Sequence, residues 1–265
     1  MKNIVISSEN VCDLSKEELS SCNIYVISKN CDGSCLSTFE QVDAKINEFD
    51  YYKYFDKLLE EAKTIVHICV SNRLNSMYNM ALLGKDKLDE DKKNRVVVLD
   101  SKNGSLALGL MLKIACEMAN NGSSAEDIAV MVQEMNNHIS TVYTSEELNS
   151  LPITHKMNKF TAFFNKLFKI FGVFKINTKG KLQAIAKVKS NKKAIRKLAK
   201  YIVKKYDNYA DLPIYILYSN CEEDARLLQE EIKKHINVEV NVKPIETKQP
   251  APKKALATFF TSSSK

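Results

Sequence analysis

Residues 95–120 read RVVVLDSKNGSLALGLMLKIACEMAN and contain the pattern that decides the fold. The β-branched run Arg95–Leu99 predicts a buried strand. A polar turn containing Gly104 follows, and the apolar spacing of Ser105–Asn120 predicts a long helix that ends at Asn121 and Gly122. A buried strand followed by a long helix is the repeating unit of a parallel sheet with helices on its faces.

The same alternation extends along the first half of the chain. The spacing predicts strands at Asn3–Ser7, Asn23–Ser28 and Thr64–Val70, and helices at Lys16–Ser21, Phe49–Ala62, from about Asn75, and at Ser124–Asn137. Glu18 lies three residues after Ser15, which is the spacing of a helix capping box. We therefore expect an N-terminal α/β domain over residues 1–150, built on a parallel sheet.

The pattern changes after about residue 140, and we expect a second, basic α/β domain over residues 151–265. Its predicted elements are a helix at Met157–Phe171, a hairpin of Val173–Ile176 with Leu182–Val188, a helix at Ala194–Lys205, a strand at Ile214–Tyr218, a helix at Glu222–His235, and strands at Val238–Val242 and Ala255–Phe260. Lys179 and Gly180 mark the turn of the hairpin.

The net charge of +7 over 265 residues is unevenly distributed. The segment Lys156–Lys205 contains 16 Lys or Arg and no Asp or Glu, and the rest of the chain carries 23 basic and 32 acidic residues. This asymmetry favours an anionic partner such as a membrane surface or an acidic protein. A solvated lysine-rich face is the alternative. We expect no nucleic acid, because no nucleic-acid-binding module is evident.

The sequence also predicts a cytoplasmic protein. No apolar run reaches the length of a transmembrane helix, and the N-terminus has no secretory signal pattern. The seven cysteines are an odd number in mostly apolar or helical surroundings, which favours buried thiols in a reducing compartment. Cys31 and Cys35 are four residues apart, but the nearest histidine is His67, so we expect no metal site.

No established catalytic motif is present. His67 lies within a predicted buried strand and is interpreted as a core residue. His155 lies in a predicted loop with no evident nucleophile beside it. We therefore expect neither an enzyme nor a cofactor.

Binding has better support than catalysis. The turn Ser71–Ser76 supplies hydroxyl, amide and backbone donors just before a predicted helix, which suits a carboxylate or a phosphate. It follows a strand of the predicted parallel sheet, as does the turn Asp100–Gly104, and ligands bind at the carboxyl ends of such strands. The alternative for the first turn is an ordinary helix cap.

The second binding feature is the segment Lys159–Ile176, which holds six of the eleven phenylalanines, Phe164 and Phe168 among them, interleaved with lysines. Such a basic amphipathic helix can lie on an anionic membrane or line an apolar ligand cavity. A core helix with a solvated lysine face remains the alternative.

Four segments together resemble a known family. VLDSKNGSLALGL at Val98–Leu110 tracks V-I-D-S-x-x-x-S-x-G-L-G-L, VSNRLNSMYNMA at Val70–Ala81 is similar to I-S-S-K-L-S-G-T-Y-Q-S-A, SSENVCDLS at Ser7–Ser15 to T-D-S-T-A-D-L-P, and KVKSNKKA at Lys187–Ala194 to K-V-R-G-x-K-K-A. In this order and spacing they resemble the DegV family of bacterial fatty-acid-binding proteins.

The resemblance implies a two-domain α/β protein that carries a long-chain fatty acid in a cavity between the domains and presents it to a partner kinase or a membrane enzyme. The expected lipid-binding residues are Ser71, Asn72 and Asn47, from the resemblance, and Phe164 and Phe168, from the phenylalanine-rich segment. Asn72 replaces a family serine. The family's T-S-Q-P-S loop is missing, and Asn47 lies in its nearest remnant, Ile46–Glu48. Ile153 stands where the family has arginine, and Pro250–Lys254 lacks the family histidine.

Three hypotheses follow. The chain is a divergent fatty-acid carrier, a degenerate paralogue that docks on a protein or membrane without fatty-acid phosphorylation, or an enzyme of a kind not evident from its motifs. Because the family's arginine and histidine are absent, we expect weak phosphorylation of a bound fatty acid or none.

Overall fold

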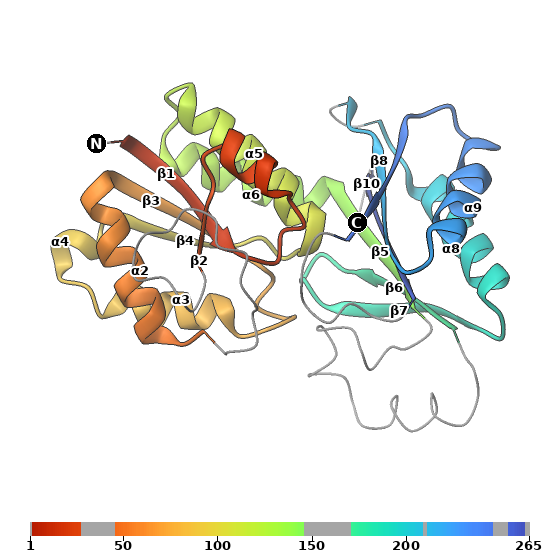
Figure 1. The fold of residues 1–265 in the computed structure, drawn as a ribbon, viewed down its shortest axis with the longest axis horizontal. Helices are drawn as coiled ribbons and strands as arrows, with labels where there is room; N and C mark the ends of the chain where they lie inside the picture. Colours follow the sequence, from red (N-terminus) through yellow and green to blue (C-terminus); the bar gives the residue numbers. More distant parts are fainter. Residues whose placement is uncertain (1, 28–45, 146–170, 209–210, 246–253, 263–265) are drawn as a thin grey trace. The chain divides into compact units, whose positions relative to one another are not determined.

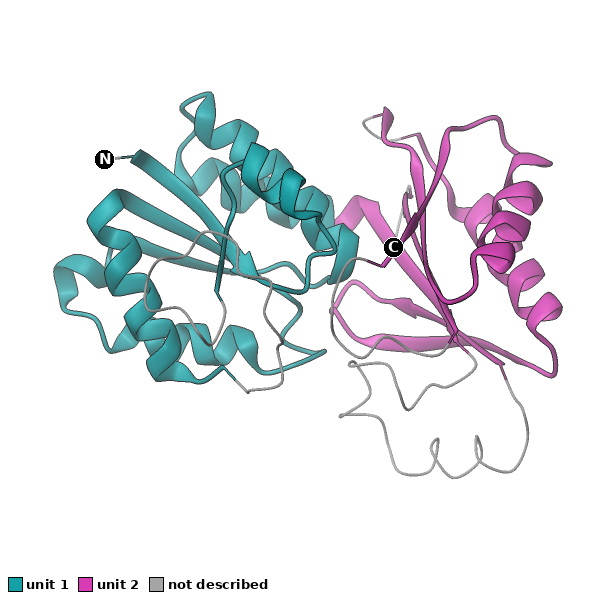
Figure 2. Cartoon of the chain, viewed as in Figure 1, with its two compact units in different colours: residues 1–136, 246–249 teal, residues 137–245, 250–265 magenta. Residues whose placement is uncertain are grey.

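The computed structural model of the chain describes residues 2–27, 46–145, 171–208, 211–245 and 254–262 (Figure 1). It divides into two units, residues 1–136 with 246–249 and residues 137–245 with 250–265 (Figure 2). The division falls at residue 136, whereas the sequence analysis expected the first domain to end at residue 150. The strand that follows residue 138 pairs within the second unit, which explains the earlier division.

Unit 1 alternates strands and helices, as the sequence predicts. Its elements are β1 (Lys2–Glu9), α1 (Lys16–Ser21), β2 (Tyr25–Ile27), α2 (Glu48–Glu61), β3 (Ala62–Cys69), α3 (Met77–Asp86), α4 (Glu90–Lys93), β4 (Val96–Asp100), α5 (Ser105–Asn120) and α6 (Ala125–His138). The long helix has the predicted bounds. The capping box of Ser15 and Glu18 is confirmed, because each side chain accepts the other residue's backbone N–H.

The described strands of unit 1 form the parallel sheet A, in the order β2-β1-β3-β4. In its register Ser7 pairs with His67, and Cys69 pairs with Asp100. Residues that pair in a parallel sheet share a face, and residues two apart on a strand share it as well. Sheet A therefore brings the carboxyl ends of β1, β3 and β4 to one edge.

Helices cover both faces of sheet A. Helices α5 and α6 lie on one face, and α2 and α3 lie on the other (Figure 1). The inward face of α2 buries Tyr51, Tyr54, Phe55, Leu58 and Leu59 at helical spacing. This stripe packs on Val5, Ile65 and other apolar residues of the sheet, so it holds α2 over the same face that carries His67.

Unit 2 contains β5 (Ile139–Ser145), β6 (Phe171–Ile176), β7 (Leu182–Val188), α8 (Asn191–Lys205), β8 (Ile214–Ser219), α9 (Glu222–Lys233), β9 (Val240–Pro244) and β10 (Ala255–Thr261). Its sheet B has the order β7-β6-β5-β10-β8-β9 and is antiparallel except for the pair β8–β9. Helices α8 and α9 pack on one face, over a core that includes Val142, Ile216 and Phe260.

Two local predictions for the second half differ from the structure. The sequence analysis gave no strand at Ile139–Ser145, which is β5, and Phe171 begins β6 instead of ending a helix. The predicted hairpin is confirmed, since β6 and β7 pair antiparallel around a turn in which Gly180 has φ +74°. Within the described residues, no helix combines the length and the apolar character needed to span a bilayer.

We predict that Gly84→Ala destabilises unit 1, although alanine ordinarily favours a helix by about 1 kcal/mol over glycine. A Cβ at this position in α3 would lie 2.5 Å from the Cβ of Tyr51 and 2.8 Å from the carbonyl oxygen of Glu48. Overpacking of this kind costs about 1–3 kcal/mol. Urea denaturation should show the loss, whereas Asn79→Ala on the exposed side of α3 should change the free energy of unfolding by less than about 0.5 kcal/mol.

Candidate functional site

Polar residues gather at the carboxyl edge of sheet A in two places. The first comprises the turns after β3 and β4, Ser71–Asn72 and Asp100–Asn103, which we call the edge turns. The second is a buried group on the face under α2, comprising Ser7, Glu9, Tyr51, His67 and Cys69, which we call the Glu9 cluster. The edge turns are the site that the sequence predicts, and the Glu9 cluster is not.

Backbone hydrogen bonds lock the two edge turns together. The Ser71 N–H donates to the carbonyl oxygen of Asn103 at 2.7 Å. One carboxylate oxygen of Asp100, Oδ1, accepts the N–H of Asn72 at 3.3 Å and that of Lys102 at 2.8 Å. Burial raises the pKa of Asp100 above its ordinary value, although these two backbone donors lower it. Asp100 therefore fixes the position of both turns.

The predicted head-group residues Ser71 and Asn72 are adjacent but differ in exposure. Ser71 is fully buried, and its Oγ accepts the N–H of Arg73 at 3.2 Å. Asn72 is partly exposed, and the neighbouring Arg73 is exposed. The side-chain amide of Asn72 can thus donate to an anion that approaches the edge, and the positive charges of Arg73 and Lys102 favour such an anion.

The other predicted site residues have different positions. Asn47 is the N-cap of α2, where its Oδ1 accepts the N–H groups of Phe49 and Asp50. The Asp50 carboxylate in turn accepts the N–H of Asn47. This capping box accounts for an asparagine at position 47 without any ligand. Phe164 and Phe168 lie outside the described residues, as does most of the predicted phenylalanine-rich helix.

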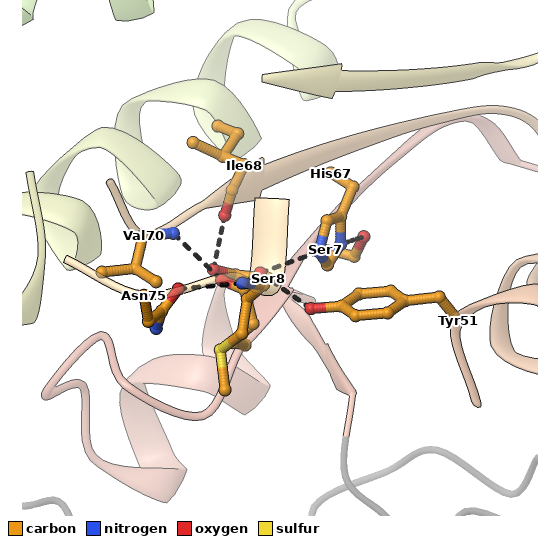
Figure 3. A network of polar contacts seen from close by, with 9 residues as sticks. Ser7, Ser8, Tyr51, His67, Ile68, Val70 and Asn75 are labelled. Carbon is orange, nitrogen blue, oxygen red and sulfur yellow. Dashed lines mark hydrogen bonds and ion pairs between the residues drawn. The ribbon is translucent and has the colours of Figure 1, made fainter. Parts of the chain in front are cut away.

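The Glu9 cluster is built by strand register. Ser7 on β1 pairs with His67 on β3. Glu9 and Cys69 each lie two residues further along these strands, so all four side chains share the face under α2. Figure 3 shows Tyr51 reaching in from α2 and the backbone of Val70 closing the network. All five side chains of the cluster are fully buried.

Three polar groups contact the Glu9 carboxylate. Tyr51 Oη donates to Oε1 at 3.0 Å, the Val70 N–H donates to Oε2 at 3.1 Å, and His67 Nε2 lies 3.4 Å from Oε1. The thiol of Cys69 lies within 4.8 Å of the carboxylate. Behind the imidazole, Ser7 Oγ lies 2.8 Å from Nδ1, and Tyr51 and Phe55 pack edge-on against the ring. The interpretation of His67 as a buried core residue is confirmed.

The carboxylate dominates the electrostatics of the cluster. Burial alone raises the pKa of Glu9, but the hydrogen bond and charge of His67 and the Val70 N–H outweigh it, and the pKa is lowered. Burial and the adjacent Glu9 charge raise the pKa values of Tyr51 and Cys69 well above their ordinary values. At neutral pH the cluster therefore contains an ionised Glu9, a neutral phenol and a protonated thiol.

Ser7, His67 and Glu9 contact one another in that order, and they are the residue types of the nucleophile, base and acid of a catalytic triad. None of the three is exposed, so a substrate in solvent cannot reach the hydroxyl. Glu9, His67 and Cys69 also place a carboxylate oxygen, an imidazole nitrogen and a sulfur within 4.8 Å of one another. Sequence reasoning missed this group, although the alternation of His67 and Cys69 on one face of β3 was a signal for it.

Comparison with known proteins agrees with this fold and these motifs. A sequence model described as "Uncharacterised protein, DegV family" matches residues 4–248. The chain belongs to the DegV family. It is 24% identical over 254 residues to a DegV domain-containing protein of Clostridium perfringens, covering 88% of this chain and 87% of the relative.

Solved DegV structures share the fold at low sequence identity. A structure from Thermus thermophilus, described as "Fatty Acid Binding of a DegV family Protein", matches with a TM-score of 0.76 and 19% identity, over 98% of this chain and 99% of that one. A DegV protein of Eubacterium eligens, loaded with heptadecanoic acid, matches with a TM-score of 0.75 and 17% identity, over 98% and 100% of the two chains. The expected DegV-like α/β architecture is confirmed.

We predict that Glu9→Gln lowers the free energy of unfolding at pH 7 by about 3–5 kcal/mol, because it removes one partner of a buried charged network. It should also change the pH dependence. The folded-state pKa of Glu9 lies below the ordinary 4.5, so its stabilisation is complete above that pH and is lost as the pH falls through the folded value.

Urea denaturation between pH 3 and pH 7 measures both effects. The Gln variant should lose less stability on acidification than the unmodified protein, and Glu60→Gln on the exposed face of α2 should behave like the unmodified protein. Parallel curves for Glu9→Gln and the unmodified protein would contradict the role of the Glu9 charge.

Proposed function

We propose that this DegV-family chain is a carrier that binds a long-chain fatty acid. The observation that carries the proposal is the match, over nearly the whole chain, to DegV structures described as fatty-acid-binding or as loaded with a fatty acid. Removing methylene groups from water gives about 0.8 kcal/mol each, so an acyl chain supplies ample free energy of binding. The protein then needs only a few polar groups to fix the head group.

The edge turns are the proposed place for the carboxylate. They follow strands of a parallel sheet, where ligands of α/β folds bind. Asn72 is a partly exposed amide donor, Arg73 and Lys102 are nearby cations, and Ser71 holds the turn through its buried hydroxyl. In this proposal the amide of Asn72 replaces the hydroxyl of the family serine.

We assign the chemistry to a partner and not to this chain. The Ser7–His67–Glu9 arrangement is fully buried, which supports a carrier over a hydrolase. A fatty-acid kinase is the partner class that the family resemblance implies. The described cysteines, Cys12, Cys22, Cys69, Cys116 and Cys221, are free thiols, which supports a reducing, cytoplasmic location.

A second candidate function is docking on an anionic membrane through α8. This helix buries Ala194, Ile195, Leu198, Ala199 and Ile202 and exposes Lys192, Lys193, Arg196, Lys197, Lys200 and Lys204. None of its lysines forms an ion pair with a described carboxylate. The basic face is therefore available to anionic lipid head groups, and a carrier of fatty acids would exchange its cargo at such a surface.

We predict that native mass spectrometry of the purified protein shows one copurified molecule of fatty-acid mass per chain. Asn72→Ala should weaken binding of a long-chain fatty acid about 10- to 150-fold, because a hydrogen bond to a charged group contributes about 1.5–3 kcal/mol. Asn72→Ser, which restores the hydroxyl of the family motif, should bind at least as tightly as the unmodified protein.

Asn120→Ser, at the exposed end of α5, is the matched control and should bind like the unmodified protein. A chain that neither copurifies with nor takes up a fatty acid would refute the carrier proposal. Normal binding by Asn72→Ala would instead refute the placement of the head group.

We predict that the protein sediments with vesicles containing anionic lipid at low salt and not with neutral vesicles. Each basic residue near such a surface contributes about 1 kcal/mol, so the triple variant Lys193→Gln, Lys197→Gln, Lys200→Gln should bind roughly 100-fold more weakly. Removing three exposed lysines of unit 1, Lys53, Lys63 and Lys87, is the matched control for net charge. Equal loss in both triple variants would contradict docking through α8.

A further inference from the structure

We propose that Glu9, His67 and Cys69 form a binding site for one divalent transition-metal ion, of which zinc is the best fit. Their oxygen, nitrogen and sulfur ligand atoms already lie within 4.8 Å of one another, and all three side chains are fully buried. The inference is independent of fatty-acid binding.

The donor set has the chemistry of a zinc site. Thiolate, imidazole and carboxylate are the side chains that bind zinc, at about 2.0–2.3 Å, and three protein ligands with one further position are an established arrangement. A tetrahedral ion with such bonds holds its ligands less than about 4 Å apart. His67 Nε2 and Glu9 Oε1 meet this requirement at 3.4 Å, so side-chain shifts of about 1 Å bring in Cys69.

Ser7 supplies the outer partner that a ligating histidine requires. Without a metal, Nε2 of His67 lies beside Glu9 Oε1, and Nδ1 lies beside Ser7 Oγ. With Nε2 bound to the ion, the ring proton is on Nδ1 and donates to Ser7 Oγ, 2.8 Å away. Such an outer-shell bond fixes both the tautomer and the orientation of a metal-binding imidazole.

The charges balance when the ion binds. Binding releases the thiol proton of Cys69 to solvent, so one carboxylate and one thiolate neutralise the two positive charges of the ion, and a neutral imidazole completes the set. Tyr51 keeps its hydrogen bond to the carboxylate, and the Val70 N–H keeps its own. The buried cluster then holds no net charge, which low-polarity surroundings favour. Because the site is buried, the ion enters as the chain folds, and its affinity couples to stability.

The test is to refold the full chain with Co²⁺ or Zn²⁺ and measure bound metal after gel filtration. We expect one metal per chain, a near-ultraviolet sulfur-to-cobalt charge-transfer band, and a melting temperature that rises with zinc concentration. Cys69→Ser should remove the band, and His67→Gln should lower the bound metal at least tenfold. Cys116→Ser, at another buried thiol, is the matched control and should leave both unchanged.

The double variant Cys31→Ser, Cys35→Ser tests whether these two cysteines, which lie outside the described residues, bind the metal instead. This variant should keep the charge-transfer band. The proposal is overturned if the unmodified chain binds less than a tenth of an equivalent of metal, or if the band depends on Cys31 and Cys35 and not on Cys69. Should Cys69→Ser fail to fold, X-ray absorption of the zinc-loaded unmodified chain decides. One sulfur ligand with nitrogen and oxygen supports the site, and a sulfur-free or multi-sulfur shell overturns it.

Discussion

The Glu9 carboxylate is the constraint on which the arrangement of unit 1 depends. A buried ion loses its hydration, and only donors placed around it can compensate. Here the polar partners come from α2 through Tyr51, from β3 through His67, and from the backbone at Val70. The charge therefore fixes a helix and two strands relative to one another. Val70 directly precedes Ser71, so the same bond sets where the first edge turn begins.

Much of the architecture could be predicted because it depends on local patterns. The apolar period of Ser105–Asn120 gave a helix with the observed bounds, and Ser15 with Glu18 gave a capping box. The short all-buried strand β5 could not be predicted in this way. Its seven residues, Ile139–Ser145, mix polar and apolar types, and their strand character comes from pairing with β6 and β10.

The candidate site shows the same limit. Ser71 and Asn72 could be found from sequence because a polar turn after a buried strand has a defined place in an α/β fold. Glu9 could not be found from sequence, because its contacts depend on the strand register that pairs Ser7 with His67, 60 residues apart. Asn47 was assigned to the ligand from family resemblance, yet its side chain already accepts two backbone N–H groups as the N-cap of α2. A polar residue near a helix start needs its backbone partners known before a ligand is assigned to it.

The central place of β10 in sheet B has a consequence for synthesis of the protein. This strand, Ala255–Thr261, lies between β5 and β8 and pairs with both, so neither neighbour has its full set of backbone partners until residue 261 is available. The described strands of sheet A, in contrast, are complete by residue 100. On the ribosome, sheet A can therefore form while the chain is still growing. The strands β5 and β8 of sheet B, in contrast, lack the backbone hydrogen bonds to β10 until β10 is synthesised. Until then, the unpaired edges of these two strands are the part of the emerging chain most open to aggregation and to chaperones.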